Sequence, residues 1–200
     1  MDPSFWNARY SAADYVYGTA PNGFLVDCAA HIPSGPVLCL GEGEGRNAVF
    51  LAGRGHAVTA VDQSEVGLAK ARRLAAERGV SLATVVTDIS DYAIAPGAWA
   101  AVVSIFFHLP PALRRRVHQQ AAAGLQSGGV IILEAYTPAQ IRFRTGGPVD
   151  SPELLMALSD LQEDFAGLEL RIGRELEREV REGANHRGHG AVVQVLARKP

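Results

Sequence analysis

Short apolar runs alternate with helix-like stretches along most of the chain. Five runs have the length and composition of buried strands, and they cover residues 37–40, 56–62, 81–87, 99–105 and 130–136. Between them, apolar positions recur at helical spacing; one such stretch carries Leu68, Ala71 and Leu74 on one face and arginines on the other. Alternating strands and helices of this size predict a parallel sheet with helices on both faces.

The last quarter of the chain follows a different pattern. A helix is expected to begin at residue 151, where apolar residues recur at steps of four, three and four. From 168 to 180 the even positions are mostly apolar, which favours a half-buried strand, although charge pairs four residues apart leave a helix open. A glycine-rich turn at 182–190 and a β-rich run at 191–197 would complete a hairpin. The predicted fold class is α/β: a doubly wound, mostly parallel seven-stranded sheet with a C-terminal antiparallel hairpin.

Aromatic residues gather near the N-terminus. We expect Trp6 and Tyr10 to anchor an N-terminal helical lid segment, residues 1–30, to the core. Tyr15 and Tyr17 are the better candidates to cover a cationic ligand, since ring faces attract cations by about 0.5–2 kcal/mol.

Composition and charge exclude several classes of partner. The net charge of −2 and the isoelectric point near 6.3 predict no general attraction to nucleic acid or to an anionic membrane. The N-terminus lacks the features of a signal peptide, and the longest apolar run is far shorter than the ~18 residues that span a bilayer. Cys28 and Cys39 do not resemble a disulfide framework. We expect one cytoplasmic domain over residues 1–200, with an oligomeric state that the sequence does not reveal.

A glycine loop follows the first apolar run and leads directly into a helical pattern. A strand, a tight glycine turn and a helix form the first unit of a doubly wound sheet, in which ligands sit at the carboxyl end of the strand. Arg46 stands where a dinucleotide fingerprint has its third glycine, and the two interleaved glutamates suit a cation better than a pyrophosphate. Both features argue against a nucleotide-dependent oxidoreductase. The loop residues are Gly41, Glu42, Gly43, Glu44 and Gly45.

Two acids follow the second and third apolar runs. Asp62 comes 21 residues after Gly41, where an acid can accept hydrogen bonds from both hydroxyls of a ribose. Ser64 is available to cap the next helix, so a binding role is favoured for Asp62. Asp88 is placed to accept from an adenine amino group, but it could equally be a turn residue, and both interpretations stay open.

Together these features resemble class I S-adenosylmethionine-dependent methyltransferases. The resemblance rests on Val-Leu-Cys-Leu-Gly-Glu-Gly-Glu-Gly-Arg-Asn at 37–47, on Asp62, on Asp88-Ile89 and on the terminal hairpin. Within that class, Gly-Glu-Gly-Arg-Asn-Ala, Phe-Phe-His-Leu-Pro and Thr-Gly-Gly-Pro at 145–148 resemble the tellurite-resistance and thiopurine methyltransferase branch.

The resemblance implies S-adenosylmethionine as cofactor and suggests the residues around it. Such enzymes usually carry an acid two residues before the first glycine, whereas this chain has Cys39, and we expect Glu42 to substitute for that acid. Residues 104–108 would line the methyl-transfer side. The expected cofactor-binding residues are Tyr15, Tyr17, Gly41, Glu42, Gly43, Gly45, Arg46, Asn47, Asp62, Gln63, Asp88, Ile89, Ser104 and Phe106.

The implied reaction is in-line attack of a small-molecule nucleophile on the sulfonium methyl group, with a chalcogen oxyanion (tellurite or selenite) or a thiol as acceptor. A binding protein that holds the cofactor without catalysis is an open alternative. His108 would act as a base or merely pack at a strand end. Basic residues in the late loops would recognise the substrate or be ordinary surface charge. The histidines among them are weak evidence for a metal, and none is expected. The candidates for catalysis are His108, Arg142, His186 and Arg187, with Arg144 and His189 beside them.

Overall fold

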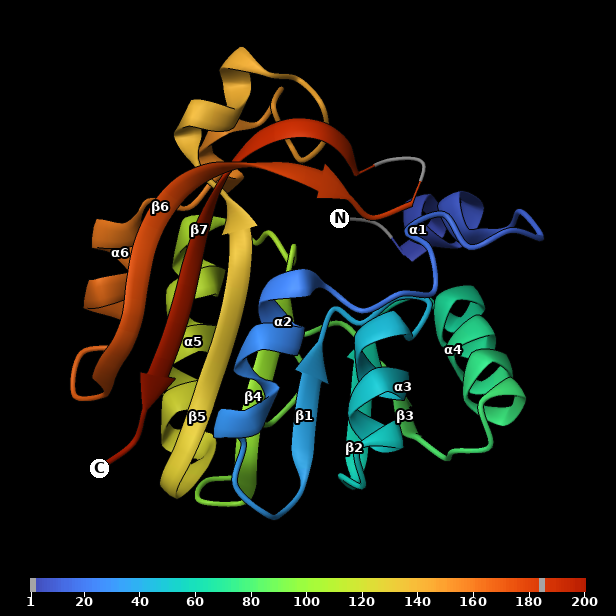
Figure 1. Ribbon diagram of the computed structural model, residues 1–200, viewed down its shortest axis with the longest axis horizontal. Coiled ribbons are helices and arrows are strands. Elements are labelled where there is room, and N and C mark those ends of the chain that lie inside the picture. The colour runs from blue at the N-terminus through green and yellow to red at the C-terminus, as the bar shows by residue number, and fades with distance from the viewer. Residues whose placement is uncertain (1–2, 184–185) are drawn as a thin grey trace.

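The computed structural model describes residues 3–183 and 186–200 (Figure 1). Residues 1 and 2 of the predicted lid segment lie outside the described residues. Residues 184 and 185 of the predicted glycine-rich turn also lie outside them. The α-helices are α1 Pro3–Tyr10, α2 Gly23–Cys28, α3 Arg46–Gly53, α4 Glu65–Glu77, α5 Pro111–Gly124 and α6 Leu158–Asp164. Short 3₁₀ helices cover η1 Ala29–His31, η2 Pro138–Arg142 and η3 Pro152–Leu154. The strands are β1 Val37–Leu40, β2 Val58–Asp62, β3 Ala83–Val86, β4 Trp99–Ile105, β5 Leu125–Tyr136, β6 Glu169–Arg181 and β7 Arg187–Arg198.

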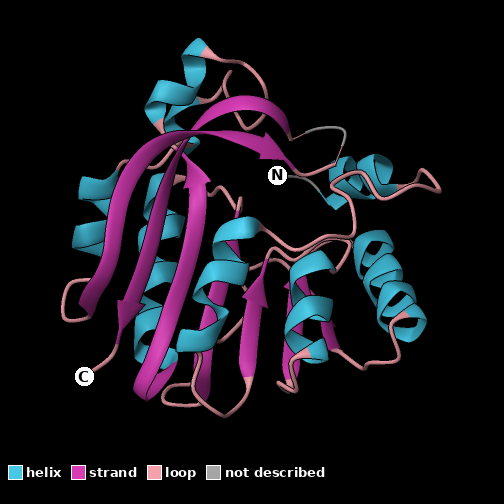
Figure 2. Ribbon diagram, in the orientation of Figure 1, coloured by secondary structure: helices cyan, strands magenta, loops and turns pink. Residues whose placement is uncertain are grey.

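The strands form one seven-stranded sheet in the order β3-β2-β1-β4-β5-β7-β6. The first five strands in this order pair in parallel, whereas β7 is antiparallel to both β5 and β6. Figure 2 shows the sheet as one layer between helices. The predicted fold class is confirmed, including the closing antiparallel hairpin of β6 and β7.

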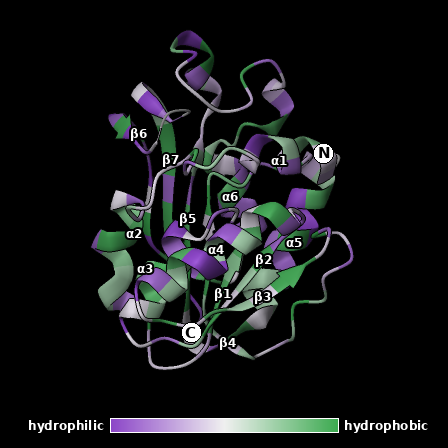
Figure 3. Ribbon diagram, turned by 90° about the vertical axis from the view of Figure 1, so that its right-hand side faces the viewer, coloured by the Kyte–Doolittle hydropathy of each residue, from purple (hydrophilic) through white to green (hydrophobic). Residues whose placement is uncertain are grey.

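The helices cover the two faces of the sheet separately. Apolar residues of α2, α3 and α4 pack on one face against β1, β2 and β4. Residues of α5 and α6 pack on the other face, against β4, β5 and β7. Figure 1 accordingly shows α2 and α3 in front of the sheet and α5 behind it. Helices such as α4 mix hydrophilic and hydrophobic colours in Figure 3, as expected of elements with one face on a sheet and the other in solvent.

The strand register brings the functional loops to one edge. Leu40, the last residue of β1, pairs with Val61 on β2 and with Ser104 on β4. The loops that follow these three parallel strands therefore leave the sheet side by side. The strand order reverses between β1 and β4, and doubly wound sheets bind ligands at the carboxyl edge of such a switch point.

The N-terminal segment and the turn between β6 and β7 meet above this edge. The rings of Tyr17 and His186 lie 4.6 Å apart between centroids, and the backbone of Gly183 lies against residues 16–18. Figure 1 shows the far end of β6 pointing toward the N-terminal side of the molecule. Within the described residues, no helix combines the length and the apolar character that crossing a membrane requires.

The C-terminal third corrects several predicted boundaries. Helix α5 ends at Gly124 rather than at Gly128-Gly129, and β5 begins at once, because a register shift opposite Trp99 lets the strand start early. The helix expected from residue 151 divides into η3 and α6. The segment 169–181 is a strand, so the helical alternative is wrong. Its partner β7 begins before the end of the predicted turn.

One arginine of α5 is buried. Arg114 pairs with Asp160 at 3.2 Å and with Asp164 at 3.3 Å. Asp164 also accepts from Nδ1 of the buried His118 at 2.8 Å. This charge cluster joins α5 to α6 and lies away from the ligand edge.

Candidate functional site

A cavity of about 680 Å³ opens at the carboxyl edge of β1, β2 and β4. Its floor consists of the glycine loop and the ends of β2 and β4. Its walls come from the N-terminal segment, from the loop that contains Arg144 and Gly147, and from His186. Of the predicted site residues it brings together Tyr17, Gly41, Glu42, Arg46, Asn47, Asp62, Gln63, Asp88, Ile89, Phe106, His108 and His186.

Two glycines of the loop have positive φ angles and lie too close to neighbouring residues for a side chain. Gly41 has φ +59°, and a Cβ there would lie 2.2 Å from the Phe107 ring. Gly45 has φ +92°, and its Cβ would lie 2.6 Å from the Cβ of Ala71 on α4. A side chain at either position is strained and also collides with its neighbour. The spacing of the loop therefore fixes how α3 and α4 pack beside the cavity.

Glu42 turns back under the loop and caps α3. Its Oε1 accepts from the backbone N–H groups of Asn47 at 3.0 Å and Ala48 at 2.8 Å. Gly45, at the N-cap position of α3, has no side chain to do this. Burial raises the pKa of Glu42 to about 7, against the lowering effect of these hydrogen bonds and of Arg46.

Asp62 ends β2 and holds the glycine loop in place. Its Oδ2 accepts from the N–H of Gly43 at 2.8 Å and its Oδ1 from the N–H of Ser64 at 2.8 Å. Burial raises its pKa in spite of these bonds. Ser64 caps α4 through Gly67, so Asp62 is not needed for that cap.

Asp88 lies at the cavity but is exposed. Its Oδ1 accepts from the N–H of Ser90 at 2.7 Å, and this bond lowers its pKa. The neighbouring Ile89 is buried and lines the cavity. The geometry is that of a turn that leaves Asp88 at the rim, which is compatible with both interpretations of this residue.

Glu44 forms a buried ion pair that attaches the N-terminal segment. Lys70 on α4 approaches its Oε1 at 2.6 Å and also donates to the carbonyl of Asp14 at 2.7 Å. The N–H of Tyr17 donates to Glu44 Oε2 at 3.3 Å. Tyr15 lies on the outer side, with its ring 5.3 Å from Lys70 Nζ, and does not line the cavity.

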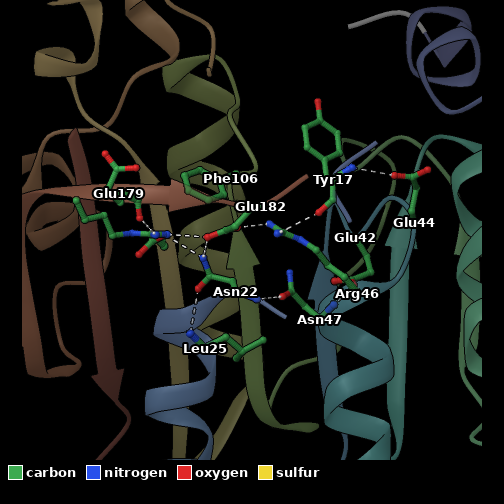
Figure 4. Close-up of polar contacts among 12 residues, drawn as sticks. Tyr17, Asn22, Leu25, Glu42, Glu44, Arg46, Asn47, Phe106, Glu179 and Glu182 are labelled. Atoms are coloured by element: carbon green, nitrogen blue, oxygen red, sulfur yellow. Dashed lines mark hydrogen bonds and ion pairs between the residues drawn. The ribbon is translucent and has the colours of Figure 1, made fainter. Parts of the chain in front are cut away.

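A buried polar network joins the glycine loop to the hairpin (Figure 4). Arg46, the first residue of α3, pairs with Glu182 at 2.6 Å and donates to the carbonyl of Tyr17 at 3.4 Å. Asn22 donates 2.9 Å bonds to both Glu134 and Glu182. Arg178 and Gln194 complete the network by hydrogen bonds to Glu134, and Arg178 also pairs with Glu182 at 2.7 Å.

Sequence reasoning missed this network. One signal was available, because Glu134 interrupts the apolar run of β5 and is fully buried. A charged residue inside a buried strand requires a partner. The sequence did not reveal that the partners come from the N-terminal loop and from β6.

His108 is hydrogen-bonded through both of its ring nitrogens. Its Nε2 accepts from the backbone N–H of Tyr136 at 3.1 Å, which places the proton on Nδ1, 3.2 Å from the carbonyl of Phe106. Both ring nitrogens are therefore occupied by backbone groups, and burial lowers the pKa to about 4. The neutral ring joins the end of β4 to the end of β5, as in the packing alternative.

Aromatic rings form the wall next to His108. The ring of Phe106 lies 4.6 Å from both Tyr136 and His186, measured between centroids. Phe106 has φ +52°, an unusual conformation for a residue with a side chain and one found mainly at functional sites. Within the described part of the chain, the buried Nδ1 of His186 and the hydroxyl of Tyr136 have no hydrogen-bond partner.

The other predicted residues lie elsewhere. Ser104 is buried in β4 and does not line the cavity. Arg142 is exposed and pairs with Glu177 at 2.7 Å, and Arg187 is exposed at the start of β7. Arg144 reaches the cavity rim but pairs with Asp150 at 2.7 Å. Gly43 and Gly45 support the loop from outside the lining.

Comparisons with known proteins show which proteins the chain is similar to. Residues 37–129 match a family model described as a methyltransferase domain. The chain is 31% identical over 125 residues to the 2-heptyl-1-hydroxyquinolin-4(1H)-one methyltransferase of Mycobacteroides abscessus. This match covers 60% of the chain and 55% of the relative, so it spans little more than half of that protein's length.

Solved structures share the fold. A structure from work on the conversion of a disulfide bond into a thioacetal group during echinomycin biosynthesis has a TM-score of 0.77 and 21% identity, covering 98% of this chain and 92% of that one. TehB from Haemophilus influenzae has a TM-score of 0.72 and 22% identity, covering 99% and 67%. Further similar folds include S-adenosylmethionine-dependent methyltransferases, one of them with bound S-adenosylhomocysteine. The matched domain over residues 37–129 and the shared fold make the chain similar to class I S-adenosylmethionine-dependent methyltransferases.

Proposed function

We propose that this protein transfers a methyl group from S-adenosylmethionine to a small organic nucleophile with a flat, apolar body that carries a hydroxyl or thiol group. The observation that carries this proposal is the aromatic wall beside the glycine loop. Tyr17, Phe106 and Phe107 line the cavity there, and Leu109 and Pro148 extend the apolar surface. Such a surface suits a ring better than a small hydrated ion.

The hydrogen-bond acceptors of the cavity suit the cofactor. Carboxyl groups of Glu42, Asp62 and Asp88 line the cavity, and S-adenosylmethionine carries an ammonium group, two ribose hydroxyls and an adenine amino group that can donate to them. In this assignment Asp62 with Gln63 binds the ribose, and Asp88 with Ile89 binds the adenine. S-adenosylmethionine supplies the electrophilic methyl group, and the protein contributes position and surroundings.

The substrate side offers hydrogen-bond acceptors without a strong base. Burial and nearby arginines lower the pKa of His186 well below its usual value, so its ring is neutral at pH 7. A neutral imidazole with an unpartnered Nδ1 can accept a hydrogen bond from the acceptor's hydroxyl or thiol group and orient it for in-line attack. Tyr17 and Phe106 would hold the ring of the acceptor beside it.

The charges around the cavity favour an organic acceptor over the expected chalcogen oxyanion. Of the arginines that line the cavity, Arg46 and Arg144 each pair with a carboxylate. Arg9 lies over the Phe5 and Trp6 rings and donates to the Tyr17 hydroxyl at 3.4 Å. The curated relative, whose name indicates an N-hydroxylated heteroaromatic acceptor, is consistent with an organic substrate. A thiol on an organic body remains within the proposal.

A panel of methyl acceptors tests this function. Hydroxylated and N-hydroxylated heteroaromatics, aromatic thiols, tellurite and selenite are incubated with S-adenosylmethionine, and S-adenosylhomocysteine is quantified with the methylated products by mass spectrometry. We expect turnover with at least one ring-bearing acceptor and none with the oxyanions. Turnover confined to the oxyanions would contradict the substrate class, and no turnover by a protein that binds the cofactor would favour a non-catalytic binding role.

A further inference from the structure

Glu42 differs from the other acids of the cavity in what it contacts. The carboxylate of Glu44 pairs with Lys70 at 2.6 Å, and Asp88 is exposed at the rim. Within the described part of the chain, Asp62 is buried without an ion pair, but both of its oxygens accept from backbone N–H groups. Among the described residues, Glu42 is also a buried acid on the cavity wall with no ion pair to a basic side chain, and both of its backbone hydrogen bonds go to one oxygen, Oε1.

Some groups around Glu42 favour its ionised form, and others favour its protonated form. On α3, Arg46 favours the carboxylate but directs its guanidinium at Glu182, 2.6 Å away. On β2, Asp62 opposes ionisation, and the Cys39 thiol beneath on β1 and the Tyr10 hydroxyl on α1 are both neutral, with pKa values raised well above their usual range. The Glu42 pKa of about 7 means that its carboxyl group is about half protonated at neutral pH.

We propose that Glu42 holds the ammonium group of the cofactor's methionine part, and that binding of this cation drives the proton of the Glu42 carboxyl group into solution. The inference rests on the proposed function, because it takes S-adenosylmethionine as the ligand. One positive charge enters the buried site as one proton leaves, so the site avoids an unpaired buried charge in either state. Cofactor binding is therefore coupled to pH.

The direction of the pH effect follows from this exchange. The ammonium group favours the carboxylate, so the pKa of Glu42 is lower in the complex than in the free protein, where it is about 7. Below pH 7 a proton competes with the cofactor, and affinity falls by up to about tenfold per pH unit. Above pH 7 this competition ends.

Calorimetry with S-adenosylhomocysteine, which carries the same ammonium group, tests the proposal. Titrations at about pH 6.5 in two buffers of different ionisation enthalpy should show release of about three-quarters of a proton per site, the fraction protonated for a pKa of about 7. Glu42→Gln keeps an oxygen for the N–H groups of Asn47 and Ala48 but has no proton to release. We expect it to release none and to bind roughly 10-fold to 100-fold more weakly.

5′-Methylthioadenosine, which lacks the amino-acid part, is the matched ligand. It should bind wild type and Glu42→Gln equally and release no proton from either, which separates loss of the ammonium contact from damage to the loop. Proton release that persists in Glu42→Gln, unchanged affinity of the variant for S-adenosylhomocysteine, or equal loss of both ligands would overturn the proposal. Wild type that binds S-adenosylhomocysteine without releasing a proton contradicts the Glu42 assignment alone, whereas wild type that binds none contradicts the proposed function as well.

Discussion

Glu182→Ala is expected to lower the free energy of unfolding by about 3–5 kcal/mol, since it leaves buried positive charge without its carboxylate. Glu182 forms ion pairs with Arg46 of α3 and Arg178 of β6 and accepts a hydrogen bond from Asn22 of the N-terminal segment. The loss of Glu182 should also loosen the contact between the N-terminal segment and the end of β6 beside the cavity, and so weaken ligand binding. Denaturant unfolding followed by circular dichroism measures the stability change.

Two controls show whether the network carries this effect. Glu179→Ala, a nearby exposed glutamate on β6, should change stability by no more than about 0.5 kcal/mol. A double variant, Arg46→Met with Glu182→Met, should be more stable than Glu182→Ala, because removing both charges avoids the unpaired one. If Glu182→Ala had the same free energy of unfolding as Glu179→Ala, the buried network would not stabilise the fold.

Asp62→Ala is expected to weaken binding of S-adenosylhomocysteine by roughly 100-fold or more. The variant loses the acceptor proposed for the ribose hydroxyls and also the 2.8 Å bond that fixes the N–H of Gly43. Without the hydrogen bond to Gly43, the glycine loop is less rigidly held. Both losses therefore weaken ligand binding. Calorimetric titration gives the affinity, and thermal melting shows that the variant is folded.

Asp91→Asn is the matched control, because Asp91 is an exposed aspartate near Asp88 that does not line the cavity. It should bind with wild-type affinity. Asp62→Asn should fall between wild type and Asp62→Ala, since its amide oxygen can still accept one hydrogen bond. Wild-type affinity in a folded Asp62→Ala protein would remove Asp62 from the cofactor site.

The parallel half of the fold was predictable because its strands are short, buried and bounded by glycines. Leu40 and Val61, for example, lie in runs that only a strand covered on both faces explains. The boundaries near Gly124 and Arg187 were not predictable, because a register shift and pairing with β6 decided them. Tertiary pairing overrode the local turn signals there.

The spacing of the sequence predicts the residues of the proposed cofactor side of the site, whereas it does not predict those of the substrate side. Asp62 reaches the glycine loop because β2 lies directly beside β1, which the alternating pattern implies. The roles of Arg46 and His108 depend on partners more than 25 residues away in sequence, Glu182 and Tyr136. Nothing in the local sequence distinguishes an arginine in a buried pair from one that contacts a ligand.

The central claim is that the cavity is an S-adenosylmethionine site, and a calorimetric comparison of S-adenosylhomocysteine with NAD on the wild-type protein tests it most directly. Glu42 and Glu44 between the glycines disfavour a pyrophosphate, and Arg46 stands where a dinucleotide fingerprint has its third glycine. We predict one S-adenosylhomocysteine bound per chain and no measurable heat with NAD. Binding of NAD without binding of S-adenosylhomocysteine would contradict the account.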